Sequence, residues 1–270
     1  MGQEASVPSP QPGTSIRVIG AGLPRTGTAS LSAALEILLG GPVYHGGTQC
    51  CQGPEAHIKN WISILRRTPL RTPADEKFVL KRISAQLDGY VATTDAPGCM
   101  FVPELLRLYP DAKVVCTVSD PMGWARSIDA ASQHSSMQWF LKLLLLPVTP
   151  MRHFPTYLQA ITEGRWSELY ESPRTPQTPG IEVWEKHVEH LRNAVPKENL
   201  LFFDCREGWG PLCKALDVPV PQGIDFPRIN DGDAIDKFSK QTILKALVRW
   251  AVLFGGVAVA VGGWRRGWVS

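Results

Sequence analysis

The feature that most constrains the fold is a glycine-rich turn placed between an apolar run and a helical pattern. Residues 16–19 form a short run that is apolar except for Arg17, and residues 20–27 contain three glycines. From Thr28–Leu39 the apolar residues recur at helical spacing, and two glycines follow as a stop signal. The order of strand, tight turn and helix predicts an α/β domain that presents backbone amides at a helix N-terminus.

The rest of the chain continues this alternation. Strands are expected at residues 90–94, 113–118 and Leu200–Phe203, and the run at 113–118 lacks polar alternation, as is typical of a strand buried on both faces. Helices are expected at 101–108, after Asp120-Pro121, at Ile181–Ala194 and at Trp209–Leu216. Residues 42–88 indicate two helical pieces, and residues 136–180 are Pro-rich and predicted to be irregular. The pattern favours a three-layer α/β fold with a mostly parallel central sheet.

Composition limits the function classes. The chain has 270 residues, 44% of them hydrophobic, which is enough for one large domain. A net charge of +3 does not indicate nucleic-acid binding, which usually needs a concentrated basic face. The Lys and Arg residues at 66–82 are typical of a solvated helix face. The six cysteines have no zinc-ligand spacing and fit a reducing compartment, so no metal is expected.

We divide the chain into a disordered leader at 1–15, a domain at 16–242 and a hydrophobic segment at 243–266. Gly2 and Ser6 match a myristoylation pattern. The last segment has a run of fifteen uncharged residues that begins and ends with a tryptophan, followed by Arg265 and Arg266. It indicates a membrane tail anchor with the domain in the cytoplasm, or else a buried terminal helix of a cytoplasmic protein.

Two nucleotide-binding interpretations of the turn are disfavoured by the residues at one or two positions. A dinucleotide fingerprint requires a third glycine where Arg25 stands. A nucleoside-triphosphate loop requires Lys and Ser or Thr where the chain has Thr28 and Ala29. A nucleotide-sugar epimerase or dehydrogenase is also disfavoured, because its nucleotide-binding turn needs the same third glycine.

The third interpretation is a family resemblance. The segments GLPRTGTASLSAALEIL, Thr94-Asp95-Ala-Pro97, ELLRLYPDAKVV, Trp124-Ala-Arg-Ser127, LLFFDCREGWGPLCKAL and FPRIN resemble the P-loop sulfotransferase superfamily over residues 17–230. The likeness is to its fungal branch, which is sometimes loosely labelled epimerase/dehydratase. It implies 3′-phosphoadenosine 5′-phosphosulfate as the sulfuryl donor.

The resemblance also implies the donor-binding residues. They are the loop residues Pro24, Arg25, Thr26, Gly27, Thr28 and Ala29, with Ser119, Ser127 and Arg228. Arg25 would place a positive charge near the bridging oxygen, and Thr26 and Thr28 would donate hydroxyl hydrogen bonds. The family grips the 3′-phosphate with an Arg and a Ser, but the Arg position here is Ser119, which would weaken donor affinity about tenfold to a hundredfold. Arg126 and Arg228 are candidates for compensating this loss.

Asp95 is the first candidate for the base that accepts the acceptor's proton, because it follows an apolar strand. His45 is the second candidate and His57 the third. A small, hydrophobic, hydroxylated acceptor is expected, and the aromatic residues Trp139, Phe140, Phe154, Tyr157 and Trp166 could line its pocket or be ordinary core. The alternative function is a non-catalytic protein of the same fold that binds a nucleotide or a partner.

Overall fold

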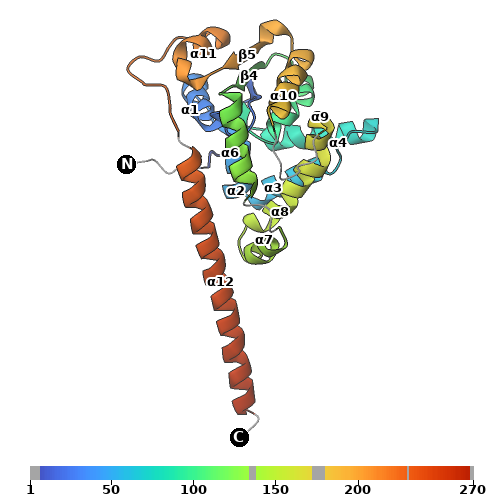
Figure 1. The fold of residues 1–270 in the computed structure, drawn as a ribbon, viewed down its shortest axis with the longest axis vertical. Helices are drawn as coiled ribbons and strands as arrows, with labels where there is room; N and C mark the ends of the chain where they lie inside the picture. The colour runs from blue at the N-terminus through green and yellow to red at the C-terminus, as the bar shows by residue number, and fades with distance from the viewer. Residues whose placement is uncertain (1–6, 134–137, 172–179, 230, 268–270) are drawn as a thin grey trace.

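The computed structural model describes residues 7–133, 138–171, 180–229 and 231–267 (Figure 1). Its centre is a sheet of parallel strands in the order β2-β3-β1-β4-β5. The strands are β1 (Val18–Gly20), β2 (Val43–His45), β3 (Ala92–Thr94), β4 (Lys113–Thr117) and β5 (Leu200–Phe203). The predicted α/β class with a parallel central sheet is confirmed.

Helices cover both faces of this sheet. They are α1 (Thr28–Leu39), α2 (Gly46–Gln52), α3 (Glu55–Leu65), α4 (Pro73–Leu87), α5 (Val102–Leu108), α6 (Pro121–Gln133), α7 (Gln138–Leu145), α8 (Phe154–Ile161), α9 (Ser167–Tyr170), α10 (Ile181–Ala194), α11 (Trp209–Leu216) and α12 (Asp231–Gly267). Because side chains alternate along a strand, Val18 packs with α1 and α11, whereas Ile19 packs with the larger core on the opposite face. Two hydrophobic cores therefore fix the sheet between helical layers.

The structure differs from the sequence prediction in two segments. Residues 42–88 contain the edge strand β2 and three helices, where two helical pieces were expected. Residues 138–170 hold α7, α8 and α9, although they were predicted to be irregular. Pro155 lies in the first turn of α8, where the absence of its N–H has no cost, so this proline begins a helix instead of breaking one.

Part of the expected leader contacts the domain. The side-chain amide of Gln49 donates to the carbonyl oxygen of Pro8 at 2.8 Å, and the backbone N–H of Gln11 donates to the carbonyl of Gly89 at 2.7 Å. The myristoylation pattern at Gly2 and Ser6 lies outside the described residues.

The C-terminal segment takes a form that the sequence did not predict. A single helix, α12, begins at Asp231 and runs through the expected boundary at 242/243, and it projects from the body of the domain beside α7 (Figure 1). Ala246 is buried against Leu145 and Val148. In the part of the chain that is described, no helix is long and apolar enough to span a membrane, so the predicted anchor is not supported. Charged residues such as Lys245 and Arg249 interrupt the apolar sequence of this helix, and the side chains of 257–266 lie outside the described residues.

A buried ion pair connects helices on the larger core. Arg165 donates to both carboxylate oxygens of Glu104, at 2.7 and 2.9 Å, and its Nε donates to the carbonyl of Met100 at 2.9 Å. Both charged side chains are less than a tenth exposed. The pair ties α5 to the segment before α9.

Glu104→Gln is therefore expected to lower the free energy of unfolding by about 3–5 kcal/mol, because it leaves the Arg165 guanidinium buried without its main counter-ion. Urea denaturation measures this loss. Glu163→Gln, at an exposed position, is the matched control. A loss of less than about 1 kcal/mol would show that the pair contributes little to stability.

Candidate functional site

The glycine-rich turn packs directly against strand β4. A Cβ atom on Gly22 would lie 1.9 Å from Oγ1 of Thr117, so only glycine fits there. The Thr26 hydroxyl donates to the carbonyl of Leu23 at 2.7 Å and lies 2.5 Å from the Thr117 hydroxyl. Gly27 caps α1 with a φ of 94°, a left-handed conformation that favours glycine. The loop is thereby fixed with the N-terminus of α1 open for an anion.

Helix α6 holds the other side of the loop. The indole Nε1 of Trp124 donates to the carbonyl of Pro24 at 2.9 Å, and Nε of Arg25 donates to the Ser127 hydroxyl at 3.1 Å. Nη1 of Arg25 is buried and has no hydrogen-bond partner among the described residues. A buried guanidinium N–H without an acceptor indicates that an anion completes this site.

Asp95, Thr28 and His45 lie together next to the loop. The Thr28 hydroxyl donates to Oδ1 of Asp95 at 3.4 Å, and Nε2 of His45 lies 3.3 Å from that hydroxyl. The backbone N–H of Thr48 donates to Nδ1 of His45 at 3.2 Å, so the neutral imidazole carries its proton on Nε2. The backbone N–H of Gly47 donates to Oδ2 of Asp95 at 3.1 Å. The carboxylate is thus positioned as a proton acceptor, while His45 presents an N–H.

His187 and Tyr170 hold the first residues of the loop in place. Nε2 of His187 lies 2.7 Å from the carbonyl oxygen of Ala21, and Nδ1 lies 2.9 Å from the Tyr170 hydroxyl. The carbonyl can only accept, so Nε2 carries the proton and the tyrosine donates to Nδ1. Burial lowers the pKa of His187 to about 4, so the ring stays neutral near pH 7.

A small pocket adjoins the loop on the side of strand β5. Its volume is about 240 Å³, and it is lined by Ser30, Cys205, Arg206, Arg228 and Ile229. The Ser30 hydroxyl accepts a hydrogen bond from the backbone N–H of Ile229 at 2.9 Å, which fixes the chain segment that carries Arg228. The Cys205 thiol lies 3.6 Å from the carbonyl oxygen of Gly27. The pocket and the loop are therefore parts of one site.

The structure gathers most of the residues that the sequence predicted. Pro24–Ala29, His45, Asp95 and Ser127 lie at the carboxyl ends of β1, β2, β3 and in α6. Arg228 lies in the adjoining pocket. Ser119 follows β4 and is half-buried, but it makes no hydrogen bond to these residues within the described chain. His57 packs instead on the Tyr44 ring, with 5.6 Å between ring centroids.

The expected acceptor pocket is not formed by the five aromatic residues. Tyr157 and Trp166 are buried in the larger core, and Phe154 packs against it. Trp139 and Phe140 are exposed on α7. These side chains serve as core or lie on the surface, so they do not identify the acceptor.

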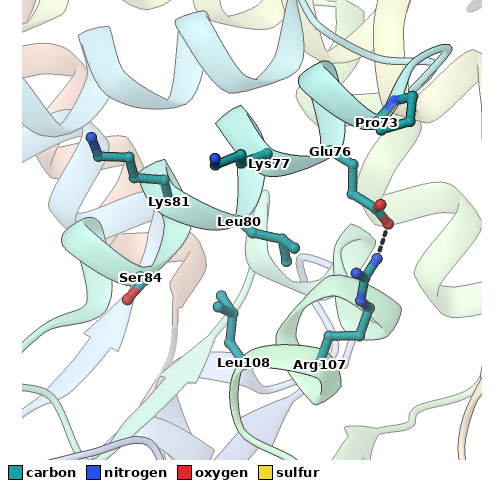
Figure 2. Close-up of a pocket in the computed structure, with 8 residues that line it drawn as sticks. All are labelled: Pro73, Glu76, Lys77, Leu80, Lys81, Ser84, Arg107 and Leu108. Atoms are coloured by element: carbon teal, nitrogen blue, oxygen red, sulfur yellow. Dashed lines mark ion pairs between the residues drawn. The ribbon is translucent and has the colours of Figure 1, made fainter.

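A separate groove lies between α4 and α5 (Figure 2). Its volume is about 460 Å³, and Leu80 and Leu108 lie between the charged side chains of Lys77, Lys81 and the Arg107–Glu76 ion pair. None of the predicted site residues lines it. Among the described residues, no group of three or more His, Cys, Asp or Glu side chains is placed to hold a metal ion.

Sequence reasoning missed Thr117, Tyr170 and His187. The signal for His187 was present, because Val183, His187 and Leu191 form the buried stripe of α10 at four-residue intervals. A histidine on an apolar stripe indicates a buried partner but does not name it. The carbonyl of Ala21 lies 166 positions away, so only the fold reveals this contact.

The buried His187 predicts a pH dependence of stability. Its folded pKa of about 4 lies below its ordinary 6.5, so the folded protein binds fewer protons than the unfolded chain between these values. The stability that depends on neutral His187 should be lost as pH falls from 6.5 to 4, by about 3 kcal/mol. His187→Gln should flatten the profile of unfolding free energy in this window. Parallel profiles for the two proteins would contradict this assignment.

Two comparisons with known proteins agree with this geometry. The family model described as a sulfotransferase domain matches residues 17–235. The chain is also 30% identical, over 260 residues, to "Ava biosynthesis cluster protein M" of Aspergillus versicolor, covering 92% of this chain and 95% of that protein. The matched span includes the loop, the Asp95 cluster and the pocket at Arg228. The chain therefore belongs to the sulfotransferase domain family.

Proposed function

We propose that the protein transfers a sulfuryl group from 3′-phosphoadenosine 5′-phosphosulfate to a hydroxyl of a small acceptor molecule. One observation carries this proposal: the anion cradle at Arg25 and the α1 N-terminus lies directly beside a buried carboxylate, because Thr28 at the start of α1 donates to Asp95. An anion site and a proton acceptor in contact are what group transfer from a charged donor to a hydroxyl requires.

The loop residues would bind and orient the donor. Backbone amides at the start of α1 and the Arg25 guanidinium stabilise the negative charge that grows on the leaving phosphate as the sulfuryl group departs. The hydrogen bond from Arg25 to Ser127 and that from Trp124 to Pro24 hold this geometry before the donor arrives. The contribution of the chain is therefore positioning and charge stabilisation, as in phosphoryl transfer.

Asp95 would accept the proton of the acceptor hydroxyl. His45 is less suited, because its Nδ1 accepts from Thr48 and its Nε2 carries the proton. Asp95 has a φ of 67°, and Arg25 a φ of 72°. Backbone strain of this kind at non-glycine residues gathers at functional sites, which supports both assignments.

The Aspergillus versicolor relative is named as a protein of a biosynthesis cluster. Because that name refers to biosynthesis, we propose that the acceptor is a small hydroxylated molecule. A second candidate function is binding of nucleotide or a partner without turnover, and Ser119 favours it, because the family's arginine at this position is absent.

Calorimetric titration with 3′-phosphoadenosine 5′-phosphate, the spent donor, tests donor binding. We expect binding in the micromolar range or tighter, with NAD and ATP binding much more weakly, because the loop lacks the dinucleotide glycine and the triphosphate lysine. Binding of all three alike would favour the non-catalytic alternative. Binding of none would remove the sulfuryl-transfer proposal.

Asp95→Asn tests the proton acceptor. An amide keeps the shape of the side chain but cannot take the proton, so kcat should fall by roughly 10²–10⁴ with whichever phenol or alcohol the unaltered protein sulfates. The affinity for the spent donor should stay within about twofold, as Asp95 does not bind the donor. Asp111→Asn, on the exposed surface, is the matched control. Full activity in Asp95→Asn would transfer the role to another group.

A further inference from the structure

The basic segment at residues 66–82 holds the positive net charge of the chain. It contains six Lys and Arg residues and two acidic residues, a net charge of +4, compared with +3 for the whole chain. Helix α4 carries most of this segment, and together with α5 it forms the groove of about 460 Å³ that lies outside the candidate functional site (Figure 2). Because charge concentrated on one face creates a local field, this groove is the place where an anionic partner is attracted.

Part of this charge is already engaged within the chain. The guanidinium groups of Arg67 and Arg82 lie over the Phe78 ring, 4.6 and 5.2 Å from its centroid. Arg67 also donates to Oδ1 of Asp75 at 2.8 Å. Internal contacts therefore account for these two arginines, and they leave the two lysines of α4 to be explained.

Lys77 and Lys81 border the groove without a counter-ion. Both are exposed and lie four residues apart on α4, so they project from one side of the helix. Within the described parts of the chain, neither ammonium group has an ion pair or hydrogen bond. Of the described residues that line the groove, only Glu76 carries a carboxylate, and it is paired with Arg107. The edge of the groove thus presents two positive charges that the chain does not neutralise.

Two half-buried leucines form the centre of the groove. Leu80 comes from α4 and Leu108 from the end of α5, and Figure 2 shows both between the charged side chains. An apolar side chain placed on these leucines would leave water, which is favourable, while the charged edge remains hydrated. An apolar centre with a charged rim is the composition of a protein interaction site.

The groove lies apart from the candidate functional site. Helix α5 ends at Leu108, shortly before β4 begins at Lys113, and α4 ends at Leu87, shortly before β3 begins at Ala92. The C-terminal ends of both helices therefore lie toward the amino ends of the strands, whereas Asp95 and the loop lie at the carboxyl ends. A partner in the groove would leave the anion site accessible.

We propose that the groove between α4 and α5 docks an acidic helical segment of a partner protein. Charge complementarity selects this occupant, because two ammonium groups four residues apart match two carboxylates at the same spacing on a facing helix. An apolar side chain of that helix lies on Leu80 and Leu108. A nucleic-acid backbone is a poorer match, since it is charged throughout and offers nothing to the apolar centre. The inference is independent of the proposed function, because none of these residues belongs to the anion site.

Fluorescence anisotropy with a designed helical peptide tests the docking surface. The probe is an alanine-based peptide with two glutamates four residues apart and one leucine on the same face. The full chain should bind it with a Kd below about 1 mM at low salt, and the affinity should fall several-fold as the ionic strength rises. Replacing both glutamates with glutamine, or the leucine with alanine, should weaken binding by about tenfold or more.

Matched variants assign the binding to this groove. Lys77→Glu combined with Lys81→Glu should weaken peptide binding by about tenfold or more, and Leu80→Ala should weaken it in the same direction. Lys197→Glu combined with Lys214→Glu changes the net charge equally at exposed positions elsewhere, so the affinity should stay within about twofold. The four lysines are exposed, so their replacement should not impair folding, and thermal unfolding verifies this.

The outcomes are distinguishable. Failure of the glutamate peptide to bind, equal binding of the glutamine peptide, or an equal loss in the control variant would overturn the proposal. Binding of phosphatidylserine vesicles in place of the peptide, lost in the Lys77→Glu and Lys81→Glu protein, would assign the groove to a lipid surface and overturn it as well. The affinity for the spent donor should be unchanged in every variant, so failure of this inference and failure of the proposed function appear in separate measurements.

Discussion

The structure of the site depends on the close approach of the glycine-rich loop to strand β4. No side chain fits between Gly22 and Thr117, and the contact between the Thr26 and Thr117 hydroxyls closes this junction. Because β1 pairs with β3 on one side and β4 on the other, fixing the loop on β4 also fixes its distance to the residues that follow β3. Asp95 and the start of α1 consequently meet, and the anion cradle is placed beside a carboxylate.

Hydrogen bonds from three helices maintain this arrangement. Trp124 and Ser127 hold the loop from α6, His187 holds its base from α10, and Ser30 holds the segment of Arg228 from α1. Each contact joins residues that are far apart in the chain, so the loop geometry requires the complete domain. The buried Glu104–Arg165 pair lies outside the site and connects the helices that support it. A preorganised loop of this kind stabilises charge without rearrangement at the moment of reaction.

The sequence predicted the elements with strong periodicity most accurately. Helices α1, α10 and α11 and strand β5 have the expected bounds, because glycine or proline signals coincide with the ends of their apolar patterns. Strand β2 escaped prediction since three residues at a sheet edge give too short a pattern. Helix α8 escaped because Pro155 lies in its first turn and begins the helix. The expected terminal anchor is not supported, because no helix in the described part of the chain is long and apolar enough to span a membrane.

The sequence by itself determined the class of the fold and predicted an anion-binding loop, because both depend on local patterns of apolar residues and on glycines in fixed positions. It also placed Asp95 at the carboxyl edge of the sheet, because Asp95 follows an apolar strand, and it named His45 as a second candidate. Only the tertiary structure decided which ring nitrogen of neutral His45 carries the proton, that His187 supports the loop, and that Arg206 and Arg228 line one pocket. These facts depend on contacts between residues that are distant in the chain, and such contacts are set by packing, which no local pattern encodes.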